Sequence, residues 1–251
     1  MNFDGRHIFW EASGHGFPLV LHHGFSQWGR DWLNAGWTKG LESRRRVISF
    51  DMLGHGRSDR PHQIDPYRIE RRAETLVAVM DAAGAERFDV FGFSLGGRVA
   101  YATAEIYPDR VRGLIVGGMH AMDPKIDRLN LEKRVQAMRT GRLAAVERAV
   151  GIRAVNAKHD VRPPNDPEAL ALTTEALFDW DGSVEALRQS DSPALLFCGQ
   201  LDPLYYWTHE TSNALHNARF LSLPHVGHAK TFYRPELSLD AIQNFLDGLR
   251  S

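Results

Sequence analysis

Short apolar runs that alternate with longer segments of helical period restrict the fold of this chain more than any other feature. Six runs of four or five residues share this character: Pro18–His22, Val47–Phe50, Phe88–Phe91, Gly113–Val116, Ala194–Phe197 and Arg219–Leu223. Strands that are apolar without alternation are buried on both faces, as in a parallel sheet covered by helices. The order of strands and helices therefore predicts a doubly wound, mostly parallel α/β sheet with helices on both faces.

The segments between these runs supply candidate crossover helices. Arg68–Ala83 carries an apolar stripe at helical spacing, and Gly84 provides a stop, because glycine readily takes the left-handed conformation that ends helices. Ile8–Glu11 is a candidate edge strand near the start of the chain.

One long stretch breaks the rhythm. From residue 119 to residue 190 there is no strand-like run, and the sequence favours helices over Leu129–Met138 and Leu143–Val150. We therefore expect one α/β core, formed by residues 1–118 and 191–251, that is interrupted by a helical cap.

Basic residues outnumber acidic ones within this cap, between Lys125 and Arg162. We interpret them as the solvated face of surface helices, since helix surfaces are normally charged and the whole chain has a net charge of only −1. The alternative is a basic cap that attracts anionic substrates.

Composition restricts the class of protein. A hydrophobic content of 43% allows a packed core, and the small net charge predicts binding neither to nucleic acid nor to a membrane surface. The single cysteine, Cys198, lies in an apolar run and is interpreted as a small buried hydrophobic residue; one cysteine cannot form an internal disulfide. No signal peptide is visible at the start. We expect a soluble, cytoplasmic protein, and the oligomeric state is not readable.

The strongest chemical signal is the sequence Gly92-Phe93-Ser94-Leu95-Gly96-Gly97, which follows an apolar run and precedes a helix-forming segment. The pattern G-x-S-x-G at this position is typical of a strained turn that exposes a serine hydroxyl at the carboxyl edge of a sheet. Backbone N–H groups at the start of the helix favour negative charge. Ser94 is therefore the candidate nucleophile; the alternative is a serine that only caps the helix.

A serine hydroxyl needs a base, and His228 is the candidate. It follows the last strand-like run, in a loop with Gly227, and loops at the carboxyl edge of a parallel sheet collect active-site groups. His225 shares this loop and is the rival.

The base in turn needs a carboxylate that fixes its tautomer. Asp202 comes directly after the run Ala194–Phe197 and is the candidate, with Asp123 as the alternative. Asp51 also ends a strand but is interpreted as a structural turn residue. The order serine, aspartate, histidine is diagnostic of one fold among the several that carry this triad.

The negative charge that develops on the substrate oxygen needs two backbone donors. We expect these to be the N–H of Leu95 and the N–H of Phe25, where Gly24 allows close approach. His22, His23 and His55 match no metal-ligand pattern, so they are interpreted as structural, and no metal or organic cofactor is expected. Five aromatic residues near the site belong either to an apolar acyl pocket or to the core: Phe25, Trp28, Trp32, Phe93 and Trp207.

These motifs, in this order, resemble the α/β-hydrolase superfamily over nearly the whole chain. The matching segments are His23–Gly24, Asp51–Asp59, Gly92–Gly96, Gly199–Asp202 and Gly227–His228. The resemblance implies an eight-stranded sheet with a cap inserted after the sixth strand.

Differences between this chain and the motifs of particular subfamilies restrict the reactions that we expect it to catalyse. Haloalkane dehalogenases and epoxide hydrolases use an aspartate where this chain has Ser94. The C–C bond hydrolases usually carry His-Gly-x-Gly-Pro-Gly and a tryptophan after the histidine, whereas Ala229 follows His228 here. Perhydrolases usually have tryptophan where this chain has Phe25. No feature of the sequence excludes an enol-lactonase. We expect a serine hydrolase that cleaves a small-molecule acyl substrate, an ester or lactone; the alternatives are a C–C hydrolase, a cofactor-free perhydrolase or a non-catalytic ligand-binding relative.

Overall fold

A computed structural model describes residues 1–149, 161 and 163–249 of the chain. Its centre is a seven-stranded sheet in the order β3-β5-β4-β6-β7-β8-β9. The strands of the structure are β1 Asn2–Phe3, β2 Arg6–His7, β3 Trp10–Ser13, β4 Phe17–His22, β5 Arg45–Phe50, β6 Phe88–Phe93, β7 Val111–Gly117, β8 Ala194–Gly199 and β9 Ala218–Leu223. The edge strand β3 is antiparallel to β5, and the other neighbours in the sheet are parallel.

The six apolar runs all become strands of this sheet, as expected. Every residue of β6 and of β8 is buried, which explains why β8 reads as a continuous apolar sequence without alternation. β6 does so apart from Asp89, whose buried carboxylate pairs with Arg112 at 2.6 Å. The candidate edge strand is also present, displaced by two residues to β3.

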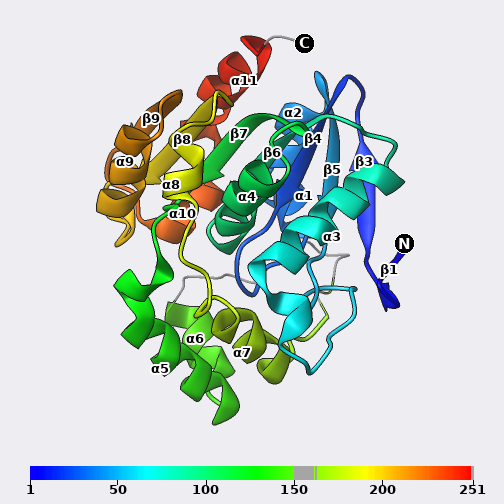
Figure 1. Cartoon of the computed structure of the whole chain (residues 1–251), viewed down its shortest axis with the longest axis vertical. Coiled ribbons are helices and arrows are strands. Elements are labelled where there is room, and N and C mark those ends of the chain that lie inside the picture. Colours follow the sequence, from blue (N-terminus) through cyan, green and yellow to red (C-terminus); the bar gives the residue numbers. More distant parts are fainter. Residues whose placement is uncertain (150–160, 162, 250–251) are drawn as a thin grey trace.

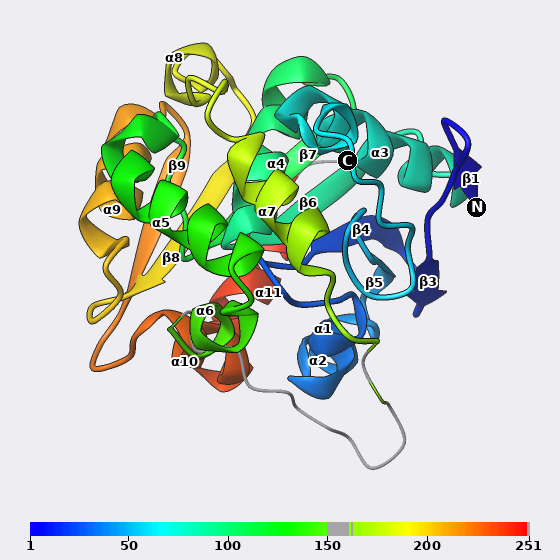
Figure 2. The ribbon, with the colours of Figure 1, turned by 90° about the horizontal axis from the view of Figure 1, so that it is seen from below.

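Helices cover both faces of the sheet (Figure 2). The helices of the structure are α1 Arg30–Asn34, α2 Trp37–Leu41, α3 Ile69–Ala82, α4 Leu95–Ile106, α5 Arg128–Arg139, α6 Leu143–Ala149, α7 Pro167–Glu175, α8 Val184–Leu187, α9 Tyr205–Ala214, α10 His228–Tyr233 and α11 Leu239–Asp247, with short 3-10 helices at Asp65–Tyr67, Pro124–Asp127 and Pro235–Leu237. Helices α3 and α4 lie on one face, and α1, α2, α10 and α11 lie on the other. Two separate apolar cores result, one on each side of the sheet.

The structure corrects the expected eight strands, because the central sheet has seven among the described residues. The first residues of the chain form a separate two-stranded sheet, β1 with β2, instead of extending the main one. A tight turn at Asp4 and Gly5, both with positive φ, joins these two-residue strands and lets them pair with each other.

Helices α5, α6 and α7 lie together beyond one end of the sheet (Figure 1). The first two match the helices expected at Leu129–Met138 and Leu143–Val150, although Val150 itself lies outside the described residues. No strand occurs between β7 and β8 in the described part of this segment. The division into a core and a cap at residues 119 and 190 stays a prediction. Among the described residues, no helix combines the length and apolar character that spanning a membrane requires.

Candidate active site

Ser94 occupies a strained turn between β6 and α4. Its φ of 53° and ψ of −120° lie where non-glycine residues rarely occur, as expected for this motif. Its side chain makes no capping hydrogen bond to α4, which disfavours the interpretation of Ser94 as a simple helix cap. A side chain at Gly96 would collide with the backbone oxygen of His22, so only glycine allows the first turn of α4 to pack against the end of β4.

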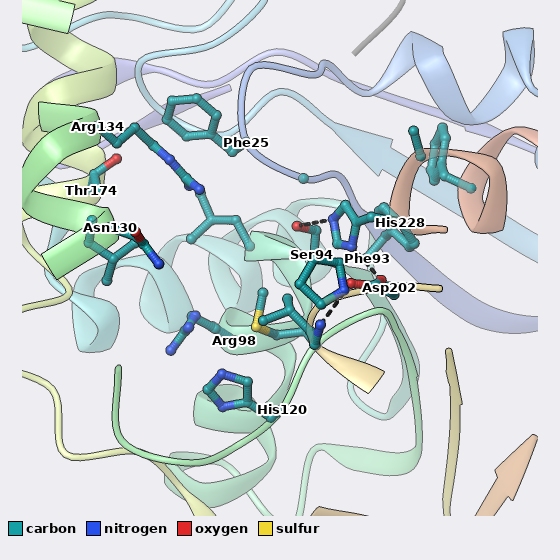
Figure 3. A pocket seen from close by; sticks show the side chains of 18 of the residues that line it. Phe25, Phe93, Ser94, Arg98, His120, Asn130, Arg134, Thr174, Asp202 and His228 are labelled. Carbon is teal, nitrogen blue, oxygen red and sulfur yellow. Dashed lines mark hydrogen bonds and ion pairs between the residues drawn. The ribbon is translucent and has the colours of Figure 1, made fainter. Parts of the chain in front are cut away.

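Two later loops bring His228 and Asp202 to Ser94 (Figure 3). The His228 Nε2 atom lies 2.9 Å from the Ser94 Oγ atom, and His228 Nδ1 lies 2.6 Å from Asp202 Oδ2. Asp202 is buried, and its other oxygen, Oδ1, accepts a hydrogen bond from the Leu204 N–H at 2.9 Å. A side chain at Gly118 would meet both the imidazole and the carboxylate at 3.2–3.3 Å, so this glycine leaves the space in which they join.

The rival residues lie elsewhere. His225 is exposed and does not line the pocket around Ser94. Asp123 caps the short helix at Pro124–Asp127 by accepting a hydrogen bond from the Lys125 N–H at 2.7 Å. Asp51 accepts hydrogen bonds from backbone N–H groups of two loops, at Gly29 and Arg57, in agreement with a structural role.

The loop after β4 lies directly against the nucleophile turn. His22 of β4 pairs with Gly92 of β6 in the sheet, so the two strands end side by side and their following loops meet. The Cβ position of Gly24 lies 3.1 Å from Ser94 Cβ, and the Gly24 N–H donates to the Gln27 side chain at 2.9 Å. Phe25 and Leu95, the two expected oxyanion donors, both line the pocket at Ser94.

Two buried histidines hold this loop as neutral hydrogen-bond acceptors. His23 Nε2 accepts from the Met52 N–H at 3.1 Å, and His55 Nε2 accepts from the Ser26 N–H at 3.1 Å. Each ring therefore carries its proton on Nδ1, which lies 2.9 Å from the Gly24 oxygen in His23 and 3.1 Å from the Leu53 oxygen in His55. In the described part of the chain, no group of three or more His, Cys, Asp or Glu side chains is arranged to hold a metal ion.

Buried imidazoles predict a loss of stability in mild acid. Burial lowers the pKa of His22 to about 3 and, together with the neighbouring Arg98, lowers that of His120 to about 3. The unfolded chain takes up these protons near pH 6.5 but the folded chain does not, so stability is lost as the pH falls below 6.5. Each histidine then removes about 2 kcal/mol between pH 6.5 and pH 5.

Urea unfolding followed by tryptophan fluorescence at several pH values checks this expectation. The free energy of unfolding should be nearly flat from pH 7 to pH 8 and should fall by at least about 4 kcal/mol by pH 5, because burial also lowers the pKa of His55 well below 6.5 and adds to the loss from His22 and His120. An unfolding free energy that changes by less than about 1 kcal/mol over that range would contradict the neutral assignment of these rings.

A cavity of about 540 Å³ opens at Ser94 between the sheet and the helices beyond it. Of the aromatic residues singled out in the sequence, Phe25, Phe93 and Trp207 line this cavity. Trp28 and Trp32 are instead buried in the protein interior. The single cysteine, Cys198, is fully buried, and burial raises the pKa of its thiol, so it stays uncharged, as expected for a core residue.

The cavity lining also includes polar residues that sequence analysis missed, among them Arg98, His120, Asn130 and Arg134. Arg98 offered a signal, because it is the one charged residue among the first ten positions of α4, four positions after Ser94. The other three offered none: Asn130 and Arg134 approach Ser94 only through the packing of α5 over the sheet, and His120 approaches it only through the path of the loop after β7.

Most described basic residues of the cap have the surface role expected from the sequence. Arg128, Lys125 and Arg139 form ion pairs of 2.6–2.8 Å with acidic neighbours on the protein surface. The part of the basic stretch at residues 150–160 and 162 lies outside the described residues. Arg134, by contrast, reaches the cavity.

A hydrogen-bonded cluster links the loop at Phe25 to the helices beyond the sheet. The Ser26 hydroxyl donates to Glu147 of α6 at 2.6 Å, and the Asn165 amide donates to the Ser26 hydroxyl at 2.5 Å and to Glu147 at 2.7 Å. Ser26 has a positive φ of 60°. The residue that follows one expected oxyanion donor is therefore in contact with two segments of the expected cap.

Comparison with known proteins identifies relatives that match most of the chain. The family model described as alpha/beta hydrolase fold matches residues 18–175. A protein of Caulobacter sp. (strain K31) that bears the provisional name carbamate hydrolase RutD is 30% identical over 249 residues, which cover 92% of this chain and 90% of that protein.

A shorter but closer match and a structural match complete the comparison. The 2-hydroxymuconate semialdehyde hydrolase of Pseudomonas sp. (strain CF600) is 40% identical over 109 residues, 42% of this chain and 38% of that enzyme. The crystal structure of the enol-lactonase from Burkholderia xenovorans LB400 superposes with a TM-score of 0.84 at 23% identity, covering 97% of this chain and 98% of that one.

Proposed function

The chain belongs to the α/β-hydrolase fold family and is a hydrolase, and on that premise we propose that it cleaves a small carboxylic ester or lactone through an acyl-enzyme. The observation that carries the proposal is the continuous hydrogen-bonded path from Ser94 Oγ through His228 to Asp202, with distances of 2.9 and 2.6 Å. This is the geometry that removes a proton from a serine hydroxyl as it attacks.

The reaction proceeds in two steps at Ser94. His228 Nε2 takes the hydroxyl proton while Ser94 Oγ bonds to the acyl carbon, and the N–H groups of Phe25 and Leu95 stabilise the negative charge on the carbonyl oxygen. His228 then gives its proton to the leaving group. Water, deprotonated by the same imidazole, bonds to the acyl carbon, the bond to Ser94 Oγ breaks, and the imidazole returns the proton to Oγ as the acid leaves. Asp202 keeps the imidazole in the required tautomer and stabilises its charged form.

The names of the relatives are those of enzymes that act on different kinds of carbonyl compound. One is named for a carbamate, one for 2-hydroxymuconate semialdehyde and one for an enol-lactone. The 40% identity to the semialdehyde hydrolase makes a C–C bond hydrolase the second candidate. The absence of a tryptophan after His228 is the sequence feature that favours an ester or lactone over it.

Residues 119–190 act in this proposal as the cap that shapes the acyl site. Asn130 and Arg134 of α5 and Thr174 of α7 line the same cavity as Ser94, which supports this role. The cap would therefore determine which acyl groups fit.

Trapping of the acyl-enzyme tests the proposal. After rapid acid quenching of a reaction with p-nitrophenyl acetate, we expect one acetyl group on the peptide that contains Ser94, together with an initial burst of p-nitrophenolate. A His225→Ala variant is the matched control and should still acylate, because that side chain is exposed and outside the cavity. Turnover with acetyl on another residue, or with none on Ser94, would contradict the proposed nucleophile.

A parallel set of substrates distinguishes the two candidates. Esters, lactones and a 1,5-dicarbonyl compound with a C–C bond to break are compared at equal concentration. Rapid cleavage of the C–C substrate with slow ester turnover would replace the first candidate by the second.

A further inference from the structure

The side of the cavity away from the catalytic histidine carries a group of nitrogen-bearing side chains. We call Arg98, His120, Asn130 and Arg134 the cationic patch. Arg98 lies on α4 one helical turn after Ser94, His120 follows β7, and Asn130 and Arg134 lie one turn apart on α5. Figure 3 shows the patch on the opposite side of Ser94 from His228 and Asp202.

The charges around this cavity favour an anion. Arg98 and Arg134 are its arginines, and Asp202 is the one acidic residue among the described residues that line it. The Asp202 carboxylate is already engaged by His228 and by the Leu204 N–H. The rest of the described lining is mainly apolar, and the effect of a charge is larger there than in water.

The two guanidinium groups are held in place by aromatic rings. Arg98 is only 4% exposed, and its guanidinium carbon lies 5.6 Å from the ring centre of Trp180. The guanidinium carbon of Arg134 lies 5.3 Å from the ring centre of Phe25. Side chains positioned in this way lose little further freedom when a ligand binds.

His120 is the independent sign that this part of the cavity takes a polar ligand. It is fully buried, and neither ring nitrogen has a hydrogen-bond partner of standard geometry in the described structure, although the backbone of Met122 lies close enough to affect its pKa. A buried polar group without a partner is costly, and a ligand oxygen would relieve that cost. Burial and the neighbouring Arg98 keep the ring neutral, so it has one N–H to donate.

We propose that the cationic patch binds a carboxylate of the substrate, so that the compound cleaved at Ser94 is a hemiester of a short dicarboxylic acid or a lactone that bears a free carboxylate. The planar fork of arginine matches a carboxylate with two hydrogen bonds. Four residues of helix separate Ser94 from Arg98, a rise of about 6 Å, which suits a chain of a few carbons between the two ends of the substrate. This inference rests on the proposed acyl-transfer function.

Matched esters test the preference. Monomethyl succinate, glutarate and adipate are compared with neutral methyl esters in which an isopropyl group replaces the carboxylate, and released acid is titrated. We expect kcat/KM for the best hemiester to exceed that for its neutral counterpart by at least about tenfold, since hydrogen bonds to charged groups contribute roughly 10- to 100-fold. Equal or better turnover of the neutral esters would overturn the proposal.

Variants identify the residues responsible. Arg98→Gln and Arg134→Gln should each lower the ratio of hemiester to neutral-ester kcat/KM by about 10- to 100-fold. Arg134 is half-buried on α5, so its variant keeps the test valid if the buried Arg98 proves necessary for folding. Lys133→Gln is the control: it removes the same charge from the same helix at an exposed position outside the cavity, and the ratio should not change. A similar fall in the ratio for Lys133→Gln, or none for either arginine variant, would overturn the assignment.

Binding without turnover separates this inference from the proposed function. Titration calorimetry on Ser94→Ala protein should detect glutarate, with affinity at least about tenfold weaker after Arg134→Gln, and should not detect dimethyl glutarate. If glutarate binding depends on the arginine but the wild-type protein hydrolyses no ester, the carboxylate site is supported and the proposed acyl-transfer function is rejected. Tighter binding of inorganic phosphate than of glutarate would assign the patch to a phosphoryl group and overturn the carboxylate proposal.

Discussion

The Ser94→Ala variant is expected to lose about 10⁶ in kcat while it keeps its fold. The hydroxyl is the group that forms the acyl intermediate, and no other described side chain lies within hydrogen-bonding distance of His228 Nε2. The Ser94 side chain makes no capping bond to α4, so its removal should leave the melting temperature nearly unchanged. Steady-state turnover of a short-chain ester and thermal unfolding measure the two effects.

Labelling with a fluorophosphonate gives this prediction an independent readout. The wild-type protein should react with one equivalent of the reagent and the variant should not, because the reagent bonds only to an activated serine. Ester turnover by Ser94→Ala at the wild-type rate would show that Ser94 is not the nucleophile.

The Asp202→Asn variant is expected to lower kcat by about 10⁴. Asp202 Oδ1 accepts from the Leu204 N–H, so an asparagine would place its own oxygen there and turn its NH₂ group toward His228. The imidazole would then accept at Nδ1 and carry its proton on Nε2, the atom that faces Ser94. In that tautomer it cannot take the serine proton.

Asp123→Asn is the matched control, because Asp123 was the rival carboxylate in the sequence. It should leave turnover within about threefold of wild type, since its side chain caps the helix at Pro124–Asp127 rather than contacting His228. Loss of turnover in Asp123→Asn with little loss in Asp202→Asn would exchange their roles.

The sheet was predictable because its inner strands are largely buried on both faces and therefore have a mostly apolar sequence. The ends of the strands were less predictable. β6 extends to Phe93, beyond the apolar run, because the turn at Ser94 and its neighbouring glycines determines where the strand ends. The separate β1–β2 sheet was not predictable, since two-residue strands have too few side chains to establish a pattern. The short helices α1 and α2 were missed for the same reason.

The candidate triad was predictable because each member sits in a short local motif directly after a strand. The cationic patch was not, because its residues come from α4, the loop after β7 and α5, and their meeting depends on tertiary packing. Charge pattern along the cap could not separate Arg134, which lines the cavity, from Arg128 and Arg139, which pair at the surface. Which cation turns inward is decided by the orientation of α5.

The strained backbone at Ser94 lowers the stability of the fold at the position that the proposed reaction requires. A residue held at φ 53° costs on the order of 1–3 kcal/mol, and glycine would relieve most of it. A selection for thermal resistance alone would therefore favour glycine at this turn. The resulting protein would be more stable but would lack the serine nucleophile. Directed evolution of this protein for heat tolerance would need an activity screen at every round to retain the serine.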